Sequence, residues 1–268
     1  MTDEHPASAR EINTSVPHSA RIWGYWLGGK DHFPVDQQAG DEYREKFPLI
    51  EKFAQESRNF LRRAVTYLAN EARIGQFLDV GAGLPTVNNT HEVAQRINPA
   101  ARIVYVDHDP LVLLHVHALL SSTPQGATAY IEADMRDTDT VLTGAAETLD
   151  MTQPIALVIS DVLGHIVDYD EALTLVRRLT DRLPPDSYLA LSHANADSPE
   201  HAAAQDAYNA SGAIPYIFRA PEQIAGFFDG LELVKPGLVS WPHWRPDLST
   251  GTVTERASWG AVARIPAP

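Results

Sequence analysis

The sequence of 268 residues contains no cysteine, which excludes disulfide bonds and thiolate metal sites. It also lacks long apolar runs, since stretches such as Ile155–Ile159 fall far short of the ~20 residues that a membrane-spanning helix needs. The first sixteen residues are polar and lack the apolar core of a secretion signal. These absences lead us to expect a cytoplasmic protein with no membrane partner.

Positively charged side chains are also scarce. The 21 Lys and Arg residues face 35 Asp and Glu residues, a formal net charge of −14, so no basic surface is available to displace counterions from a nucleic acid. We therefore expect no nucleic-acid partner. The motifs H-E-x-x-H and G-x-S-x-G are absent, and His115 and His117 stand two residues apart on a predicted helix, where they face different directions. The sequence thus predicts neither a metal centre nor a catalytic nucleophile.

The length fits one α/β domain with an N-terminal addition. We expect a flexible tail over residues 1–16, an N-terminal helical cap segment over 17–73 and the main domain over 74–268. Apolar residues recur at helical steps within the cap segment, at Phe53, Phe60, Leu61, Ala64, Val65 and Leu68. This segment either packs on the main domain as a helical layer or covers an active site.

Strand-like runs alternate with helical stretches from residue 76 onwards. The runs cover residues 76–80, 101–106, 127–131, 155–160 and 187–192. Helix starts lie between them, at Asp109-Pro110, at Asp168 with Glu171, and at Ser198-Pro199. The alternation predicts a parallel sheet with helical crossovers. Two last runs, 231–239 and 257–265, have no helix between them, which predicts an antiparallel pair at the sheet edge.

The strongest local signal is the segment FLDVGAGL at residues 77–84. An apolar strand runs into Gly81 and Gly83, which allow a sharp turn and close approach to a ligand, and a helix is predicted to begin near Thr90. Free N–H groups at such a helix start suit a carboxylate or phosphate. The alternative is a tight turn without a ligand, because a single G-x-G is weak evidence.

Acidic residues follow the next two strands. Asp107 stands 24 residues after Gly83, a spacing typical of acids that bind ribose hydroxyls, and His108 would then line the adenine side. Asp134 could accept a hydrogen bond from an adenine amino group while Met135 packs on the ring, although Asp134 could also be a solvated loop residue. Three strand ends together predict a nucleoside cofactor.

Two features distinguish between cofactors. The third small residue of the dinucleotide motif is replaced by Thr86, preceded by Pro85, which disfavours an NAD-dependent oxidoreductase. The C-terminal strand pair is the layout of the large Rossmann-like class that uses S-adenosyl-L-methionine (SAM). We therefore expect a Rossmann-like SAM-methyltransferase fold, with a mostly parallel seven-stranded sheet, a C-terminal antiparallel pair and an N-terminal helical extension.

Several stretches together resemble a bacterial family of S-adenosyl methyltransferases, long known as a domain of unknown function. They are SVPHSARIWGYWLGGKD, FLDVGAGLPTVNNTHEVAQ, IVYVDHDPLVLLHVHALL, DSYLALSHA and FFDGLELVKPG, and the resemblance runs from about Ser15 to Ile265. It implies SAM binding at Asp79, Gly81, Gly83, Asp107 and Asp134, and it implies little about the methyl acceptor.

With SAM as cofactor, the helix start would face the methionyl carboxylate, and Asp79 would attract the amino group. Ser160, which ends the fourth strand-like run, belongs to the same expected cofactor site. Tyr25 is expected near the cationic sulfur, where cation–π attraction is favourable, and Arg21 and Lys30 near the carboxylate or an acidic substrate. Trp26 would lie beside Tyr25 near the sulfur if this segment closes the pocket, but for Trp23 and Trp26 we favour the alternative that they are core anchors of the helical layer.

Methyl transfer is an in-line displacement that depends on alignment, and an oxygen or nitrogen acceptor can also require a base. Candidate bases at the ends of the fourth and fifth strands are Asp161, His165, His193, Asn195 and Asp197. We select His165 and His193, with a structural histidine as the alternative for each. Many relatives have a leucine-histidine pair after the fourth strand, whereas here the histidine is displaced by one residue, so His165 departs from the family pattern.

The sequence therefore predicts a SAM-dependent methyltransferase that acts on a small-molecule acceptor. The alternative is a non-catalytic, regulatory protein that binds SAM or another nucleoside. An enzyme requires space for an acceptor beyond the cofactor, whereas a binder could fill that space with its N-terminal aromatic residues. The fold alone does not decide between them, and the sequence sets no oligomeric state.

Overall fold

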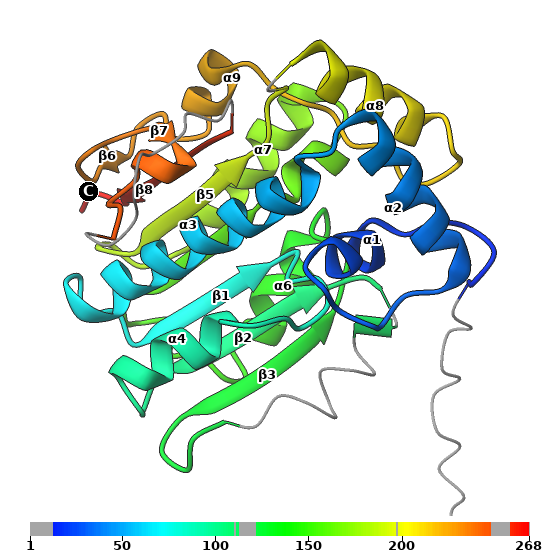
Figure 1. The fold of residues 1–268 in the computed structure, drawn as a ribbon. Coiled ribbons are helices and arrows are strands. Elements are labelled where there is room, and N and C mark those ends of the chain that lie inside the picture. The colour runs from blue at the N-terminus through cyan, green and yellow to red at the C-terminus, as the bar shows by residue number, and fades with distance from the viewer. Residues whose placement is uncertain (1–12, 110, 113–121, 197, 248–257, 268) are drawn as a thin grey trace, which may run out of the picture.

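The computed structural model describes residues 13–109, 111–112, 122–196, 198–247 and 258–267. Its central layer is a sheet of eight described strands in the order β3-β2-β1-β4-β5-β8-β6, with β7 also paired to β8 (Figure 1). The strands are β1 Gln76–Val80, β2 Arg102–Asp107, β3 Ala127–Glu132, β4 Ala156–Ser160, β5 Tyr188–His193, β6 Glu232–Leu233, β7 Val239–Ser240 and β8 Trp259–Arg264.

Strands β1 to β5 are parallel, and β8 is antiparallel to β5, as the sequence predicts. The predicted strand over 231–239 is instead two short strands, β6 and β7, which both pair with β8. Pro236 and Gly237 lie between them, and Gly237 has a φ of +92° in a turn closed by its N–H to the carbonyl of Val234. This turn raises the expected seven strands to eight.

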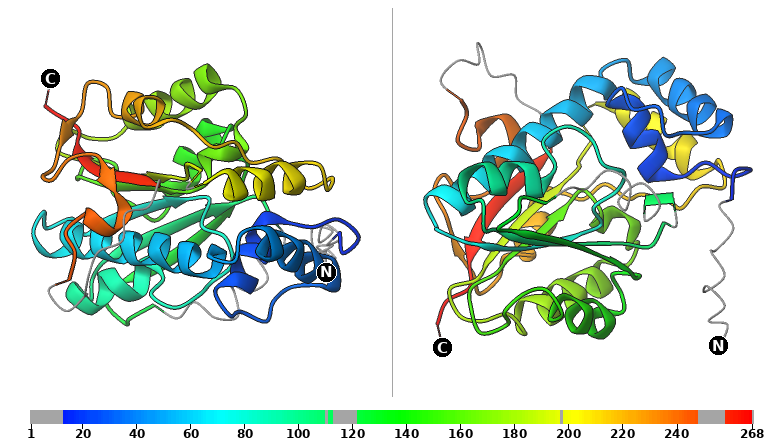
Figure 2. Two further views of the ribbon diagram at one scale, coloured as in Figure 1. Left: turned by 45° about the horizontal axis from the view of Figure 1, so that its top comes forward. Right: turned by 90° about the horizontal axis from the view of Figure 1, so that it is seen from below.

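Helices cover both faces of the sheet. They are α1 Ser19–Trp26, α2 Pro34–Lys46, α3 Ile50–Asn70, α4 Thr90–Ile97, α6 Thr138–Ala145, α7 Tyr169–Thr180, α8 Pro199–Asn209 and α9 Pro221–Gly226, with 3₁₀ turns at Leu163–His165 and Trp241–His243. Figure 2 shows α3 and α4 on one face and α6 and α7 on the other. Of the helix predicted after Asp109, the structure describes Leu111 and Val112 as helical, while His115 and His117 lie outside the described residues.

The predicted stripe on α3 forms part of the hydrophobic core. Phe53, Phe60, Leu61 and Leu68 are buried in one cluster with residues of β1 and β2. Phe60 packs so closely on β8 that a Cβ added at Gly260 would lie 2.6 Å from its ring. The second half of the expected cap segment is therefore a layer of the sandwich, while α1 and α2 lie beyond the carboxyl ends of the strands (Figure 1).

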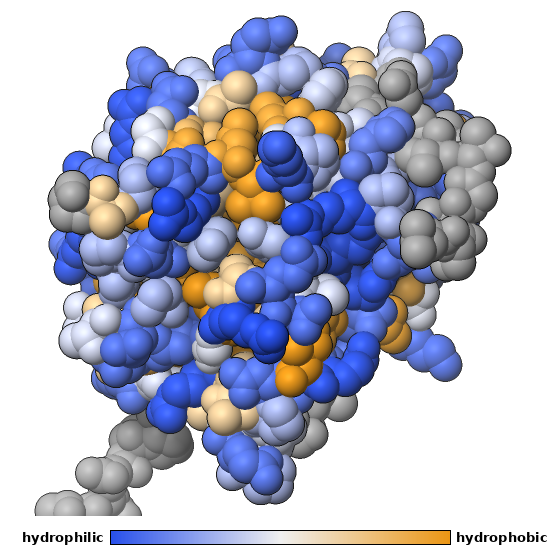
Figure 3. Space-filling view, turned by 90° about the vertical axis from the view of Figure 1, so that its left-hand side faces the viewer, coloured by the Kyte–Doolittle hydropathy of each residue, from blue (hydrophilic) through white to orange (hydrophobic). Residues whose placement is uncertain are grey.

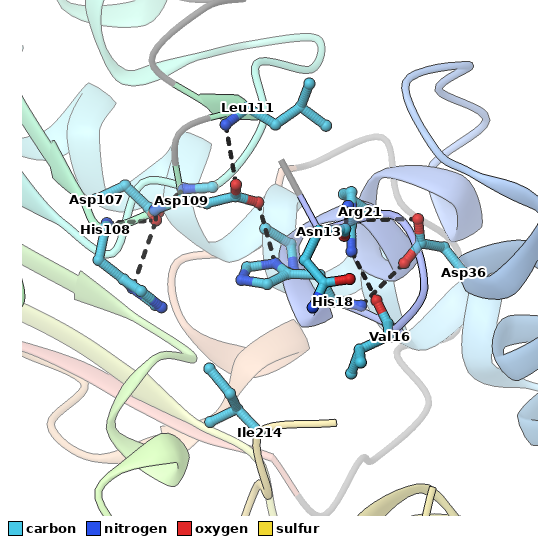
Figure 4. Close-up of polar contacts among 12 residues, drawn as sticks. Asn13, Val16, His18, Arg21, Asp36, Asp107, His108, Asp109, Leu111 and Ile214 are labelled. Atoms are coloured by element: carbon cyan, nitrogen blue, oxygen red, sulfur yellow. Dashed lines mark hydrogen bonds and ion pairs between the residues drawn. The ribbon is translucent and has the colours of Figure 1, made fainter. Parts of the chain in front are cut away.

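A buried ion pair joins α1 to the start of α2. The carboxylate of Asp36 is fully buried, lies 3.1 Å from Nε of Arg21, and accepts backbone N–H bonds from His18 and Phe33 at 2.9 Å each. Arg21 also donates to the carbonyls of Asn13 and Val16 (Figure 4). Because breaking one member of a buried pair leaves the other charge uncompensated, this cluster fixes the position of α1.

The sheet ends in a short, charged edge. Strand β6 is two residues long, and Glu232 on it accepts hydrogen bonds from Arg264 of β8 at 2.6 and 3.0 Å. Figure 3 shows apolar patches separated by hydrophilic residues on the side of the molecule that lies to the left in Figure 1. Leu233 of β6 is 47% exposed. Short strands and charges discourage pairing with another sheet edge. None of the described helices is long and apolar enough to cross a membrane.

Candidate functional site

A cavity of about 370 Å³ opens at the carboxyl ends of β1, β2 and β4. Residues of α1 and α3 close one side, and residues 214–218, after α8, close another. Ligands of open α/β sheets bind at this edge, because the loops there diverge where the strand order reverses. The cavity is therefore the candidate site.

The glycine loop after β1 forms the floor of this cavity. Gly81 and Gly83 have φ values of +77° and +64°, in the left-handed region that favours glycine. A Cβ on Gly81 would lie 2.5 Å from the side chain of Val162, so the loop also packs tightly on the residue after Asp161. Helix α4 then begins at Thr90, where the sequence places it.

Asp107 ties this loop to the end of β2. Its Oδ2 accepts the N–H of Gly83 at 2.7 Å, and its Oδ1 accepts the N–H groups of His108 and Asp109 at 2.8 and 3.0 Å. A carboxylate offers about four acceptor positions, so one remains at Oδ2 for a ligand hydroxyl. The side chain of His108 is 53% exposed, and both His108 and Ile214 line the cavity (Figure 4).

The residues after β3 and β4 also line the cavity. Asp134 is half exposed and pairs with Arg136 at 3.2 Å, while Met135 is buried beside it. Ser160 shares a hydrogen bond of 3.0 Å with Ser192 of β5. The structure thus brings the predicted residues of four strand ends to one cavity: Asp79, Gly81, Gly83, Asp107, His108, Asp134, Met135 and Ser160.

Asp79 is a buried carboxyl group at the base of the cavity. It accepts a hydrogen bond of 2.6 Å from Oγ1 of Thr90, and burial raises its pKa to about 6. Arg58 of α3, which the sequence analysis did not select, also lines the cavity and acts on this carboxylate through its charge. Its Nη2 donates to the carbonyls of Val87 and Asn88, and its Nε is buried with no hydrogen-bond partner among the described residues.

Three predicted N-terminal residues do not line the cavity. Arg21 is engaged by Asp36, Tyr25 donates its hydroxyl to Asp41 at 2.7 Å, and Lys30 is exposed. The other residues of α1 line the cavity instead, namely Ser19, Ala20, Ile22, Trp23, Gly24 and Trp26, with His18 before the helix and Leu27 after it. The sequence contains the aromatic run, but the choice of face depends on how α2 packs against α1.

His165 lines the cavity near Asp107. Its Nδ1 lies 2.9 Å from the carbonyl of Pro215, which can only accept, so Nδ1 carries the proton and Nε2 keeps its lone pair. Burial lowers the pKa of His165 to about 4. The ring is therefore neutral near pH 7 and accepts a hydrogen bond well, but it is a weak proton acceptor.

His193 is fully buried and is not among the residues that line the cavity. Its Nδ1 donates to the carbonyl of Ala194 at 2.8 Å, and its Nε2 accepts from Nη1 of Arg219 at 2.8 Å. Burial lowers the pKa of His193 to about 3. With both ring nitrogens engaged, this geometry matches the structural alternative. Asn195 donates its side-chain amide to the carbonyl of Arg219, and Asp197 lies outside the described residues.

Asp161 stands at the junction of β4, β5 and α3. Its φ is +54°, and its Oδ2 accepts from Ser57 at 2.5 Å and from Ser192 at 3.2 Å. Burial raises the pKa of Asp161 to about 6. Ser57 was not predicted, although a serine inside the apolar stripe of α3, four residues after Phe53, was a visible signal.

Aromatic residues line another part of the same cavity, which we call the aromatic arm. Aromatic rings from distant segments line this arm: Trp26, Trp23, Phe53, His201, Phe218 and Tyr216. Within the described residues no group of three or more histidine, aspartate or glutamate side chains could hold a metal ion. The site therefore combines a polar arm at the strand ends with an aromatic arm beneath α1.

The fold and the polar arm define a Rossmann-like domain that binds a nucleoside cofactor. Residues 5–266 match the family model described as S-adenosyl methyltransferase. The chain belongs to this family, and it is a SAM-dependent methyltransferase, as the sequence predicts. No curated protein matches.

Solved structures agree with the family. A DUF574 family protein from Streptomyces avermitilis MA-4680 shares 43% identity and a TM-score of 0.91, over 96% of this chain and 100% of that one. A candidate methyltransferase from Thermobifida fusca YX shares 35% identity and a TM-score of 0.84, over 99% and 100%. The N-methyltransferase NodS from Bradyrhizobium japonicum WM9, in complex with S-adenosyl-L-homocysteine (SAH), shares 14% identity and a TM-score of 0.50, over 86% and 98%, and supports the fold alone.

Proposed function

We propose that this methyltransferase acts on a small-molecule acceptor that binds in the aromatic arm. The observation that supports this proposal is that the cavity is lined by α1, α3 and residues 214–218 as well as by the strand ends. A non-catalytic binder would not require this space. A concave cavity with aromatic walls fits a small molecule better than a polymer. The lack of cysteine fits a reducing bacterial cytoplasm, which we propose as its location.

We propose that the polar arm binds the adenosyl cofactor, with a role for each of its residues. We propose that Asp107 binds a ribose hydroxyl at its remaining acceptor position, while Asp134 and Met135 hold the adenine edge and face beside His108. At the other end, Asp79 would attract the amino group, and the glycine loop allows close approach. We expect the electron-poor methyl group on the bound cofactor to supply the alkylating chemistry.

Arg58 is proposed to bind the cofactor carboxylate, in place of the predicted Arg21 and Lys30. Its Nε is buried without a partner among the described residues, and its charge acts on Asp79 in the same part of the cavity. The neutral ring of His165 is proposed to accept a hydrogen bond from the ligand through Nε2. Because its pKa is low, we do not assign proton removal to it.

The test has two stages. Calorimetric titration with SAM, SAH and NAD should show binding of the two adenosyl ligands and no heat with NAD. The protein is then incubated with SAM and, separately, with small-molecule extracts, total protein and RNA, and methylated products are detected by mass spectrometry. A mass increase confined to small molecules is expected, whereas methylation confined to protein or RNA would overturn the proposal.

A further inference from the structure

Asp161 is a carboxylate that lines the cavity without a positive charge beside it. Ser57 and Ser192 donate to its Oδ2, while its Oδ1 is buried and has no hydrogen-bond partner among the described residues. These two hydroxyls, and that of Ser160, which also acts on the Asp161 carboxylate, orient it but carry no charge that could neutralise it. An acceptor left unpaired in this way destabilises the protein until a donor arrives.

Among the described residues, two arginines line the cavity, and neither pairs with Asp161. Arg58 donates to backbone carbonyls of residues 87 and 88, and Arg136 pairs with Asp134 and Glu171 at 3.2 and 3.0 Å. In the described part of the chain, no Lys or Arg forms an ion pair with Asp161. A ligand that carries its own positive charge would therefore complete this part of the site.

The wall next to Asp161 consists of aromatic rings in contact with one another. Ring centroids lie 6.4 Å apart for Trp23 and Phe53, 4.8 Å for Phe53 and His201, 4.7 Å for His201 and Phe218, and 6.1 Å for Phe218 and Tyr216. Burial, followed by the charge of the neighbouring Asp161, raises the pKa of Tyr216, so this wall reaches the carboxylate. Aromatic faces bind planar apolar groups and attract cations.

We propose that the methyl acceptor is an arylalkylamine, an aromatic ring that carries its amino group on an alkyl chain, with its ammonium nitrogen on Asp161 and its planar body against this ring wall. The inference rests on the proposed function and deepens it, since it assigns the reacting atom and the substrate class. It also makes Asp161 the group that distinguishes an amine from an alcohol of the same shape.

With Asp161 as the proton acceptor, the protons and electrons of the reaction balance. The carboxylate takes one proton from the bound ammonium, which frees the nitrogen lone pair. That pair forms the new N–C bond to the methyl carbon while the electrons of the S–C bond pass to sulfur. The product leaves as a methylammonium ion, and Asp161 returns its proton to solvent. Burial raises the pKa of this carboxyl group to about 6, which suits a proton acceptor near neutral pH.

The test compares the binding of arylalkylamines with that of the corresponding alcohols, on protein saturated with SAH. Tryptamine, phenethylamine and naphthylmethylamine are each titrated beside tryptophol, phenethyl alcohol and naphthylmethanol. At least one amine is expected to bind at least ~10-fold more tightly than its alcohol, as expected for a charge-assisted hydrogen bond. If no amine exceeds its alcohol while SAH binds normally, the inference is wrong and the proposed function stands. If SAH itself does not bind, the proposed function is wrong, and the inference that rests on it falls with it.

Three variants test whether the amine preference depends on the charge of Asp161. Asp161→Asn should remove the amine preference and leave SAH affinity within about twofold. Ser57→Ala keeps the carboxylate and should retain the preference, which controls for disturbance of the same contact. Asp134→Asn removes a carboxylate on the cofactor side and is the matched control. It should weaken the binding of SAH but not the binding of the amine. Equal loss of SAH and amine affinity in Asp161→Asn would instead assign Asp161 to the cofactor, and a preserved amine preference in that variant would also overturn the inference.

Discussion

At the scale of single residues, the local sequence already places several side chains of the candidate site. Asp79, Asp107 and Asp134 come at or just after the ends of predicted strands, and all three line one cavity. Because parallel strands end at the same edge of a sheet, a residue at such a position is placed by secondary structure alone. His193 also ends a strand, yet its ring is buried beneath the site, since successive side chains of a strand point to opposite faces.

Asp107→Ala is expected to weaken SAH binding by about 1–3 kcal/mol, the cost of unmaking buried hydrogen bonds. The variant removes the ribose acceptor and also leaves the N–H groups of Gly83, His108 and Asp109 without their carboxylate. Calorimetric titration measures the change. Unchanged affinity would refute the ribose assignment.

His193→Gln is expected to lower the free energy of unfolding by about 1–3 kcal/mol at pH 7.5, because Arg219 and the carbonyl of Ala194 lose their partner. SAH affinity should stay within about twofold. The folded-state pKa of His193, about 3, lies below the ordinary 6.5, so its contribution is complete above pH 6.5 and is lost as the pH falls from there towards 3.

Urea unfolding of both proteins between pH 7.5 and 4.5 measures this difference. The variant should lose less stability on acidification than the parent, since His165 and the other histidines are common to both. A large loss of SAH affinity with unchanged stability would show that His193 acts in the ligand site and not as a structural residue.

At the scale of elements, the glycine loop and helix α1 behave differently. The loop follows from its own sequence, because Gly81 and Gly83 adopt the left-handed φ values that the G-x-G pattern predicts. Helix α1 forms as a local unit, but its partners decide which side chains face the site. Arg21 and Tyr25 are held by Asp36 and Asp41 of α2, so the tryptophan face lines the cavity.

Gly81→Ala is expected to weaken SAH binding at least ~10-fold. The residue would adopt a strained positive φ, and its Cβ would lie 2.5 Å from Val162, so the loop must move. Gly230→Ala is the matched control, since Gly230 has a φ of +82° and an added Cβ there would meet nothing within 4 Å. The control should lose similar backbone stability but no affinity. Equal affinities in titration would show that the loop conformation is not needed.

For the whole molecule, the decisive feature is the role of α3. The expected boundary near residue 73 separates a cap from a domain, yet Phe60, Leu61 and Leu68 lie in the same core cluster as Phe77 and Ile103 of the sheet. The apolar stripe of α3 agreed with either a cap or a layer of the core. Periodicity identifies the apolar face of a helix but not the element against which that face packs.

A fragment of residues 74–268 is therefore expected not to fold cooperatively. Removing residues 1–73 would expose the face of the sheet and leave Trp241 and Trp244 without the α3 side chains that cover them. Near-UV circular dichroism and thermal unfolding measure the outcome, and removal of residues 1–12 serves as the control that keeps every described contact. A sharp transition in the 74–268 fragment would support an independent domain.

The sequence by itself determined the alternation of strands and helices, the glycine loop and the acids at the strand ends. These features follow from local periodicity, turn chemistry and chain direction, which neighbours in the sequence set. Only the tertiary structure decided which polar groups remain free for a ligand. Ser57 reaches Asp161 across 104 residues, and Trp23, Phe53, His201 and Phe218 meet in one wall, because packing between distant segments brings them together. No local pattern encodes such contacts, since they depend on how whole elements pack.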